Sequence, residues 1–136
     1  MLLAAQPGAA EDRPIGMVKT VVGAAYVVRA DNRLPASAGV AIFITDRLET
    51  GSDGSVGVTL SDGAMLTLGN NAAFVVCEFR FEPERGVLGF VGTVLRGAVT
   101  YISGRIARLA PNKVRIETPG GEVAVRGTRV AIRVPG

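Results

Sequence analysis

The chain has 136 residues, which is enough for one domain with its own core and too short for us to expect two. Hydrophobic residues make up 48% and charged residues 20%, and this balance excludes wholesale disorder. The net charge is +3, and the absence of histidine together with a single cysteine excludes Ser-His-Asp and Cys-His catalysis, His- or Cys-rich metal sites and an internal disulfide.

Residues 1–12 are interpreted as a signal-peptide remnant or a disordered leader. Gly8, Ala9 and Ala10 form a small-x-small cleavage pattern before Glu11, whereas the positively charged start and most of the apolar segment of a signal are missing. We therefore expect the folded domain to span residues 13–136 and to be periplasmic or secreted. No stretch reaches the ~20 apolar residues that a membrane span needs.

From residue 13 onward, apolar and polar residues alternate with a period of two, and helical periodicity is almost absent. Many of the 18 glycines fall between the alternating segments, as expected for tight turns. About ten short strands are therefore expected, over residues 17–29 with a kink at Gly23, 40–44, 55–60, 64–68, 74–81, 87–95, 98–102, 105–109, 114–118, 123–126 and 129–134.

This pattern predicts an all-β fold of the β-solenoid or β-sandwich kind, with almost no helix. Asp53-Gly54 and Asp62-Gly63 lie nine residues apart, and Asn70-Asn71 falls at the next expected turn. Such a repeat fits either a solenoid rung or a β-meander, and three turns leave both open. Pro119-Gly120-Gly121 predicts a hairpin between the strands on either side.

Alternation along residues 74–81 places Val75, Cys77, Phe79 and Phe81 on one face of their strand. Because unpaired cysteines are usually buried, and because its neighbours on that face are apolar, Cys77 is predicted to be a buried, inert thiol.

Three aspartates, Asp46, Asp53 and Asp62, are the best candidates for catalysis, because paired carboxylates can hydrolyse glycosides. Asp53 and Asp62 each precede a glycine, and this placement favours turn chemistry, in which the carboxylate bonds nearby backbone. A calcium site lacks the D-x-[DN]-x-[DN]-G loop, and whether these aspartates bind a metal stays open. We expect no catalytic, cofactor or metal site.

Charge is unevenly spread along the chain. Residues 1–95 carry 7 basic and 10 acidic side chains, whereas residues 96–136 carry 8 basic and 2 acidic ones. Arginine is suited to binding carboxylates and phosphates, so a basic C-terminal face could hold an acidic partner, but a solvated strand face is the preferred interpretation. Nucleic acid is not expected as a partner, because Tyr101 is the only aromatic residue after Phe90.

Five segments resemble, in order, the motifs of the FecR family of bacterial envelope regulators. Two positions depart from the family pattern, since Thr45 stands where it usually has glycine and Ala64 where it has serine. The segments are Ile15-Gly16-Met17-Val18 with Gly23 and Val27-Val28, Ala38-Gly39 with Thr45 to Gly51, Ser61 to Gly69, Leu95 to Val99, and Thr118-Pro119 with Val125-Arg126-Gly127-Thr128.

The resemblance implies an extracytoplasmic all-β module whose motif residues are structural. For the closing motif we expect Gly127 to permit a bulge or close packing and Arg126 to pair with a carboxylate or cap carbonyls. The transmembrane helix of the family's sigma-factor regulators and their C-terminal subdomain find no counterpart, so a stand-alone module is expected. The motif residues are Asp46, Thr50, Gly51, Asp62, Gly63, Gly97, Thr118, Pro119, Arg126, Gly127 and Thr128.

These observations favour a non-enzymatic interaction or sensing module that binds an unidentified envelope protein. A polysaccharide- or cell-wall-binding structural domain is the first alternative, although the chain lacks tryptophan for stacking on sugar rings. An enzyme that cleaves glycans with Asp53 or Asp62 is the second alternative. The oligomeric state stays open.

Overall fold

The computed structural model describes residues 13–125 and 127–135, so the leader prediction and Arg126 lie outside the described residues. Within them the chain is all-β with little helix, as predicted. The strands are β1 (Gly16–Val22), β2 (Ala25–Arg29), β3 (Asn32–Pro35), β4 (Ala41–Ile42), β5 (Arg47–Thr50), β6 (Ser55–Leu60), β7 (Met65–Leu68), β8 (Ala73–Glu82), β9 (Val87–Ile102), β10 (Val114–Thr118), β11 (Gly121–Ala124) and β12 (Arg129–Val134). The helix α1 (Arg105–Leu109) and the 3₁₀ turns η1 (Pro83–Arg85) and η2 (Pro111–Lys113) complete the described structure.

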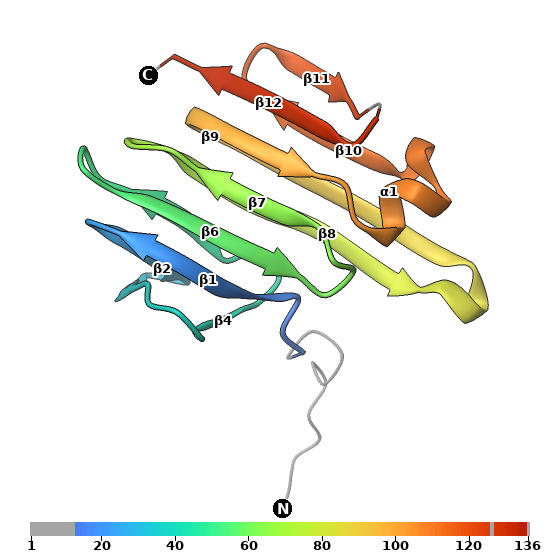
Figure 1. The fold of residues 1–136 in the computed structure, drawn as a ribbon, viewed down its shortest axis with the longest axis horizontal. Helices are drawn as coiled ribbons and strands as arrows, with labels where there is room; N and C mark the ends of the chain where they lie inside the picture. Colours follow the sequence, from blue (N-terminus) through green and yellow to red (C-terminus); the bar gives the residue numbers. More distant parts are fainter. Residues whose placement is uncertain (1–12, 126, 136) are drawn as a thin grey trace, which may run out of the picture.

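The strands form one open sheet in the order β3-β2-β5-β8-β9-β7-β6-β1-β4, with β10 and β12 also beside β9 and β11 beside β10. Neighbouring strands are antiparallel except for β9 and β10. The sheet curls so that two layers face each other (Figure 1). We call β1, β4, β6, β7, β12 and the second half of β9 the front layer, and the remaining strands with the first half of β9 the back layer.

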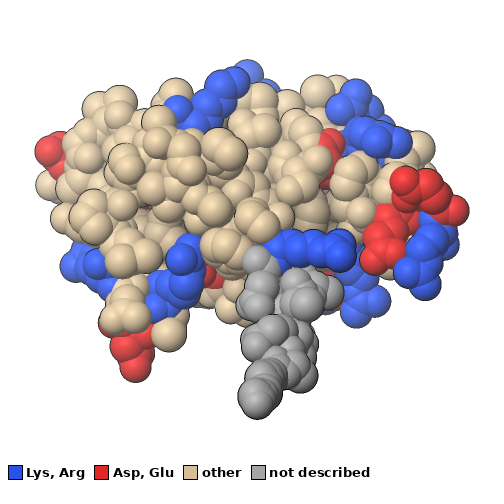
Figure 2. All heavy atoms as spheres, turned by 90° about the horizontal axis from the view of Figure 1, so that it is seen from below, with Lys and Arg blue, Asp and Glu red and all other residues tan. Residues whose placement is uncertain are grey.

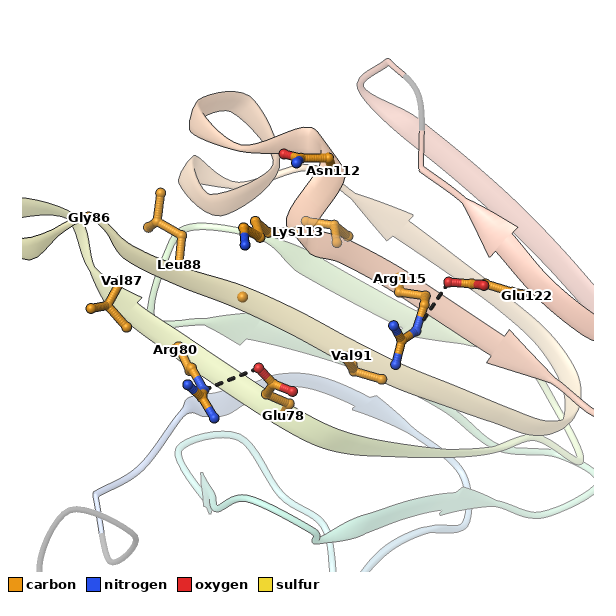
Figure 3. Close-up of a pocket in the computed structure, with 12 residues that line it drawn as sticks. Glu78, Arg80, Gly86, Val87, Leu88, Val91, Asn112, Lys113, Arg115 and Glu122 are labelled. Carbon is orange, nitrogen blue, oxygen red and sulfur yellow. Dashed lines mark ion pairs between the residues drawn. The ribbon is translucent and has the colours of Figure 1, made fainter.

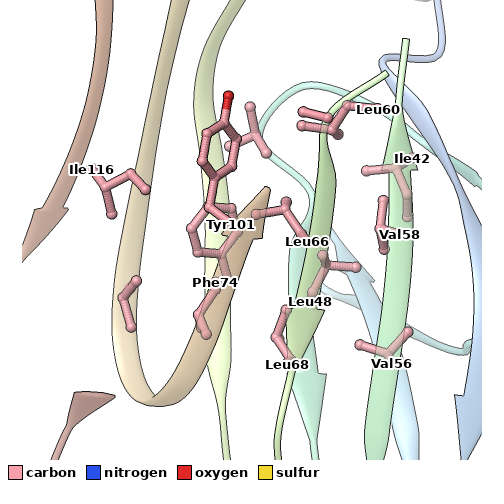
Figure 4. Close-up of a cluster of buried hydrophobic side chains, with 14 of the residues drawn as sticks. Ile42, Leu48, Val56, Val58, Leu60, Leu66, Leu68, Phe74, Tyr101 and Ile116 are labelled. Carbon is pink, nitrogen blue, oxygen red and sulfur yellow. The ribbon is translucent and has the colours of Figure 1, made fainter. Parts of the chain in front are cut away.

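The long strand β9 joins the two layers by turning back on itself near Gly97. Its first half pairs with β8 and β10, and its second half pairs with β7 and β12. Phe90 and Tyr101 of this one strand stack across the core with ring centroids 5.2 Å apart, which requires the reversal (Figure 4). The sequence predicted two strands separated by Arg96-Gly97, and the structure joins them through this turn.

Apolar side chains from both layers fill the space between them. Leu48, Phe74 and Ile116 come from the back layer, and Leu66 and Leu68 from the front (Figure 4). All five are at most 1% exposed. Because burying such a side chain contributes roughly 1.5–3 kcal/mol, this core is the main source of stability.

Four corners, where the chain passes between the layers, stack at one end of the molecule. Thr50 joins two of them, because its hydroxyl donates to the Gly69 carbonyl (2.6 Å) and accepts the Ala72 N–H (2.9 Å). The carbonyl of Gly51 accepts the Asn71 N–H, and the Gly51 N–H donates to the Ala24 carbonyl, both at 2.9 Å. The corners are thus held by hydrogen bonds to backbone rather than by side-chain packing.

A β-bulge in β8 makes the prediction for Cys77 wrong. The register with β9 shifts between Val76 and Glu78, so Cys77 is the extra residue and is exposed. Phe74 and Val76 face the core before the bulge, and Phe79, which packs edge-on against Phe90, faces it afterwards. One inserted residue therefore reverses the expected alternation partway along the strand.

Two predicted strands also differ from the structure. Residues 105–109 form helix α1, because the Asp62 carboxylate and carbonyl accept the first N–H groups of this turn. The strand expected over residues 40–44 is limited to Ala41–Ile42. The hairpin predicted at Pro119-Gly120-Gly121 is confirmed, with Thr118 paired to Gly121.

Replacement of Gly97 by alanine is expected to lower the free energy of unfolding by about 2 kcal/mol or more. Gly97 has a φ of 84°, and a Cβ there would lie 2.5 Å from the Ala72 Cα. Gly86→Ala is the matched control, because Gly86 has a φ of 69° with open space around it. Denaturant unfolding measures the free energy of unfolding of both variants. Equal losses of stability would show that the close approach of the two corners does not contribute to stability.

Candidate functional site

Asp46 is buried and forms an ion pair with the partly exposed Arg29, which the sequence did not reveal. Its carboxylate accepts hydrogen bonds from Arg29 Nε (2.9 Å) and Nη2 (2.7 Å) and from the Phe43 N–H (2.8 Å). Arg29 also donates to the Ala41 carbonyl and covers the Phe43 ring. The hydrogen bonds to Asp46 raise the pKa of Arg29. This pair ties β2 to the loop between β4 and β5.

Asp62 connects the β6–β7 turn to helix α1. Oδ1 accepts the Ala64 N–H (3.0 Å) and Oδ2 accepts the Ile106 N–H (3.1 Å), while the side chain is almost fully buried. Nearby, the buried Tyr101 hydroxyl has no hydrogen-bond partner among the described residues. Burial and the Asp62 carboxylate raise the pKa of Tyr101. Both carboxylate oxygens of Asp62 thus accept hydrogen bonds from backbone N–H groups, those of Ala64 and Ile106.

The three candidate aspartates do not meet. Asp53 lies at the end of the molecule where the four corners stack, with Oδ1 3.4 Å from the Ala24 N. The whole of β6, roughly 20 Å at 3.3 Å per residue, separates Asp53 from Asp62. A glycosidase pair needs carboxylates about 5–9.5 Å apart. Across residues 13–125 and 127–135 no cluster of three or more acidic, Cys or His side chains could hold a metal.

The other motif residues within the described ranges also contact the chain's own backbone. Thr118 donates to the Gly121 carbonyl and accepts the Gly120 N–H, and so closes the turn that contains Pro119. Ser103 binds the carbonyls of Gly127 and Thr128. Gly63 and Gly127 have positive φ with open space around them, so close packing at Gly127 is not observed.

The outer face of the back layer is charged, and its charges pair with one another. Arg47 binds Glu49, Arg80 binds Glu78 at 3.1 Å, and Arg115 binds both Glu117 and Glu122. A shallow groove of about 510 Å³ runs between β8, β9 and β10, lined by Glu78, Arg80 and Arg115 among others (Figure 3). In Figure 2, acidic and basic side chains lie along the lower margin and at one end, and basic side chains also stand at the upper margin.

The outer face of the front layer is different, because its regular positions on four neighbouring strands carry no charge. The registers place Thr67 beside Thr100 and Gly57, and Thr59 beside Met65 and Met17. The face is four strands wide, or roughly 14 Å across three strand spacings of 4.8 Å, and β12 adjoins it. We call it the uncharged face, made of Met17, Thr20, Val22, Ser55, Gly57, Thr59, Met65, Thr67, Ala98, Thr100 and Ile102.

Cations border this face. Lys19 is exposed at the irregular step of β1, and Arg129 and Arg133 are exposed on β12. Large apolar side chains are also open to solvent here, with Met17 53% and Val22 64% exposed. The face therefore combines hydroxyl, methyl and thioether groups with a cationic border.

Sequence reasoning missed this face although its signal was present. The same alternation that predicted the strands also gave their outward residues, which in 55–60, 64–68 and 98–102 are small, hydroxylated or apolar. The acidic residues considered as a candidate site lie instead in loops and turns, where their carboxylates contact backbone N–H groups. Which outward residues lie next to one another depends on how the strands pair, and local sequence patterns do not predict strand pairing.

Comparison with known proteins supports the family resemblance. The family model described as FecR protein matches residues 46–136, the part of the chain that holds β5 to β12. Residues 15–45, over which the resemblance was also seen, lie outside the matched span. No curated protein and no solved structure matches the chain. In the described part of the chain, no helix is long and apolar enough to cross a membrane.

Replacement of Thr45 by glycine is expected to raise the free energy of unfolding by about 1 kcal/mol. Thr45 is exposed and has a φ of 68°, a conformation that a β-branched residue adopts only with strain. Thr67→Gly is the control, because this exposed threonine lies in β7 and the change should destabilise the protein. If chemical denaturation shows that Thr45→Gly is less stable than wild type, the backbone of Thr45 is not strained in the way inferred from its φ angle.

Replacement of Asp62 by alanine is expected to lower the free energy of unfolding by about 2–3 kcal/mol, because two buried N–H groups lose their acceptor. Asp53→Ala serves as the comparison, because Asp53 accepts one long hydrogen bond at an exposed corner. Its replacement should lower the free energy of unfolding by less than about 1 kcal/mol. Thermal unfolding of both variants checks this, and an Asp53 loss as large as that of Asp62 would refute it.

Proposed function

Because the chain belongs to the FecR family, whose members are generally non-enzymatic sensing and regulatory domains, we propose that it binds another protein in the bacterial envelope. Family membership supports a regulatory role and an envelope location, since FecR proteins are typically associated with the envelope. We propose a periplasmic module that recognises a protein partner through one outer face.

The contrast between the two outer faces carries this proposal. Cores of protein interfaces are depleted of charged residues, because a charge buried without a partner is costly. A partner that covered the back layer would have to desolvate several ion pairs, such as Arg47–Glu49 and Arg115–Glu122. A partner on the uncharged face meets no charge at the regular positions of β6, β7 and β9. The uncharged face is therefore the better docking surface.

The chemistry of this face also suits a protein partner. Methionine side chains adapt to irregular surfaces, and Met17 and Met65 lie on either side of Thr59. The threonine hydroxyls can bond polar groups at a partner's surface, while their methyl groups stay in apolar contact. Because these residues lie on paired strands, the face offers contact over its whole width without rearrangement of the sheet.

A polysaccharide is the second candidate ligand, and the row Thr20, Thr67 and Thr100 is the observation in its favour, since hydroxyls can bond sugars. Rings for stacking on sugars are not presented beside this row. Tyr101 is fully buried, and Tyr26 lies in β2 of the back layer beneath the Arg33 guanidinium. The protein ligand is preferred for this reason.

Two threonines of β9 allow a matched test by photo-crosslinking in cells. Thr100 lies on the uncharged face and Thr93 faces outward on the back layer, and both are half-buried. With benzoylphenylalanine at one position or the other, we expect a discrete protein adduct from position 100 and none from position 93. A second change, Thr67→Glu, should reduce the adduct at least about tenfold, because it places a charge in the interface.

Equal crosslinking from both positions, or a specific adduct from position 93 alone, would overturn the proposed face. An adduct that is degraded by glycosidase treatment would instead support a polysaccharide ligand. Circular dichroism on each variant shows whether the fold has been kept.

A further inference from the structure

The strand β12 forms an exposed edge of the front layer. It pairs with β9 over its whole length, from Arg129 opposite Ile102 to Val134 opposite Gly97. Among the strands of the described residues, none pairs with its other side, and it lies at the margin of the layer (Figure 1). Its six residues run without a bulge or an internal proline.

The hydrogen-bond pattern shows which backbone groups point outward from β12. The Ser103 N–H donates to the Thr128 carbonyl at 2.7 Å, just before the first pair of the ladder. Antiparallel pairs alternate between bonded and non-bonded, so Val130, Ile132 and Val134 direct their N–H and C=O groups to β9. Arg129, Ala131 and Arg133 direct theirs away from the sheet. The edge thus offers a regular set of donors and acceptors to a further strand.

The other edges of the sheet are less suited to accept a strand. β4 has two residues, and the four residues of β3 end in Pro35, which has no N–H. β11 has four residues and begins at the hairpin glycine. Exposed edges are usually shortened or blocked to prevent unwanted pairing, and β12 is the longest of the four strands that end a pairing path within the described structure.

Charge decides between the possible occupants of this edge. Arg129 and Arg133 face outward, and neither makes an ion pair with any described residue. A second copy paired antiparallel in the register of greatest overlap, centred on Ala131, would place Arg129 of each copy opposite Arg133 of the other. Like charges directly opposite are destabilising, whereas carboxylates at those places would be stabilising.

We propose that β12 receives an extended segment of the partner protein, which adds as a strand and presents two acidic side chains, four residues apart, to Arg129 and Arg133. The inference rests on the proposed function, because β12 borders the uncharged face and an added strand would widen it. Main-chain hydrogen bonds from Arg129, Ala131 and Arg133 would supply affinity, and the two charge pairs would select the segment.

The test uses the full chain and a synthetic peptide of sequence TEVTVET, whose glutamates are four residues apart on one face of a strand. Ala131→Pro removes one outward N–H and leaves the bonds to β9, and Ala131→Thr keeps that N–H. Fluorescence anisotropy should show at least tenfold weaker peptide binding by Ala131→Pro than by Ala131→Thr. The double variant Arg129→Glu, Arg133→Glu should bind about tenfold more weakly and should instead bind the peptide TKVTVKT.

Several outcomes would overturn this inference. The first is that the wild-type chain does not bind the glutamate peptide, and the second is that the two Ala131 variants bind it equally. The third is a wild-type dimer that Ala131→Pro converts to a monomer, which would show that β12 pairs with a second copy of the chain. If Ala131→Pro fails to fold by circular dichroism, the exchange of peptide preference by the arginine variants decides alone. Crosslinking from position 100 that persists without peptide binding would leave the proposed function standing while the edge inference fails.

Discussion

The close approach of backbone segments at the corners is the constraint on which the rest of the structure depends. One open sheet becomes two facing layers only because β9 reverses at Gly97, where its backbone lies against Ala72 of the neighbouring corner. Gly54 meets the carbonyl of Ala24 in the same way at the β5–β6 corner. Hydrogen bonds from Thr50 and Gly51 then hold these corners together, so the core between the layers closes over aliphatic and aromatic side chains.

The two-layer arrangement gives the molecule two outer faces of different character. Each strand offers every second residue to solvent, and the registers bring outward residues of separate strands together. In the back layer this gathers oppositely charged residues, such as Arg80 and Glu78, which neutralise each other. In the front layer it gathers threonines and methionines, with unpaired arginines on β12 at the margin. Under the proposed function, a partner would bind this side, where desolvation is least costly and where no strand among the described residues pairs with the outer edge of β12.

Much of the fold could be predicted from local patterns, because strands and tight turns are local. Residues 55–60 alternate cleanly and form β6, and Pro119-Gly120 closes the predicted hairpin. The failures involve distant partners. Residues 105–109 form a helix because Asp62, on another turn, accepts their first N–H groups. Cys77 is exposed because β8 and β9 pair with a bulge, and Arg29 meets Asp46 only through the pairing of β2 with β5. The uncharged face depends in the same way on registers that no segment reveals alone.

The residues that carry the family resemblance and the residues that form the candidate interface overlap only in part. Thr50, Asp62, Gly97 and Thr118 lie at turns and corners and contact the chain's own backbone. Thr20, Thr59, Thr100, Arg129 and Arg133 lie outside the family motifs, on strands whose outward positions can vary without changing the core. A scaffold built in this way allows different outer faces on the same corners. Under the proposed function, the outward residues of the front layer would select the partner, and the motif residues at the corners would not.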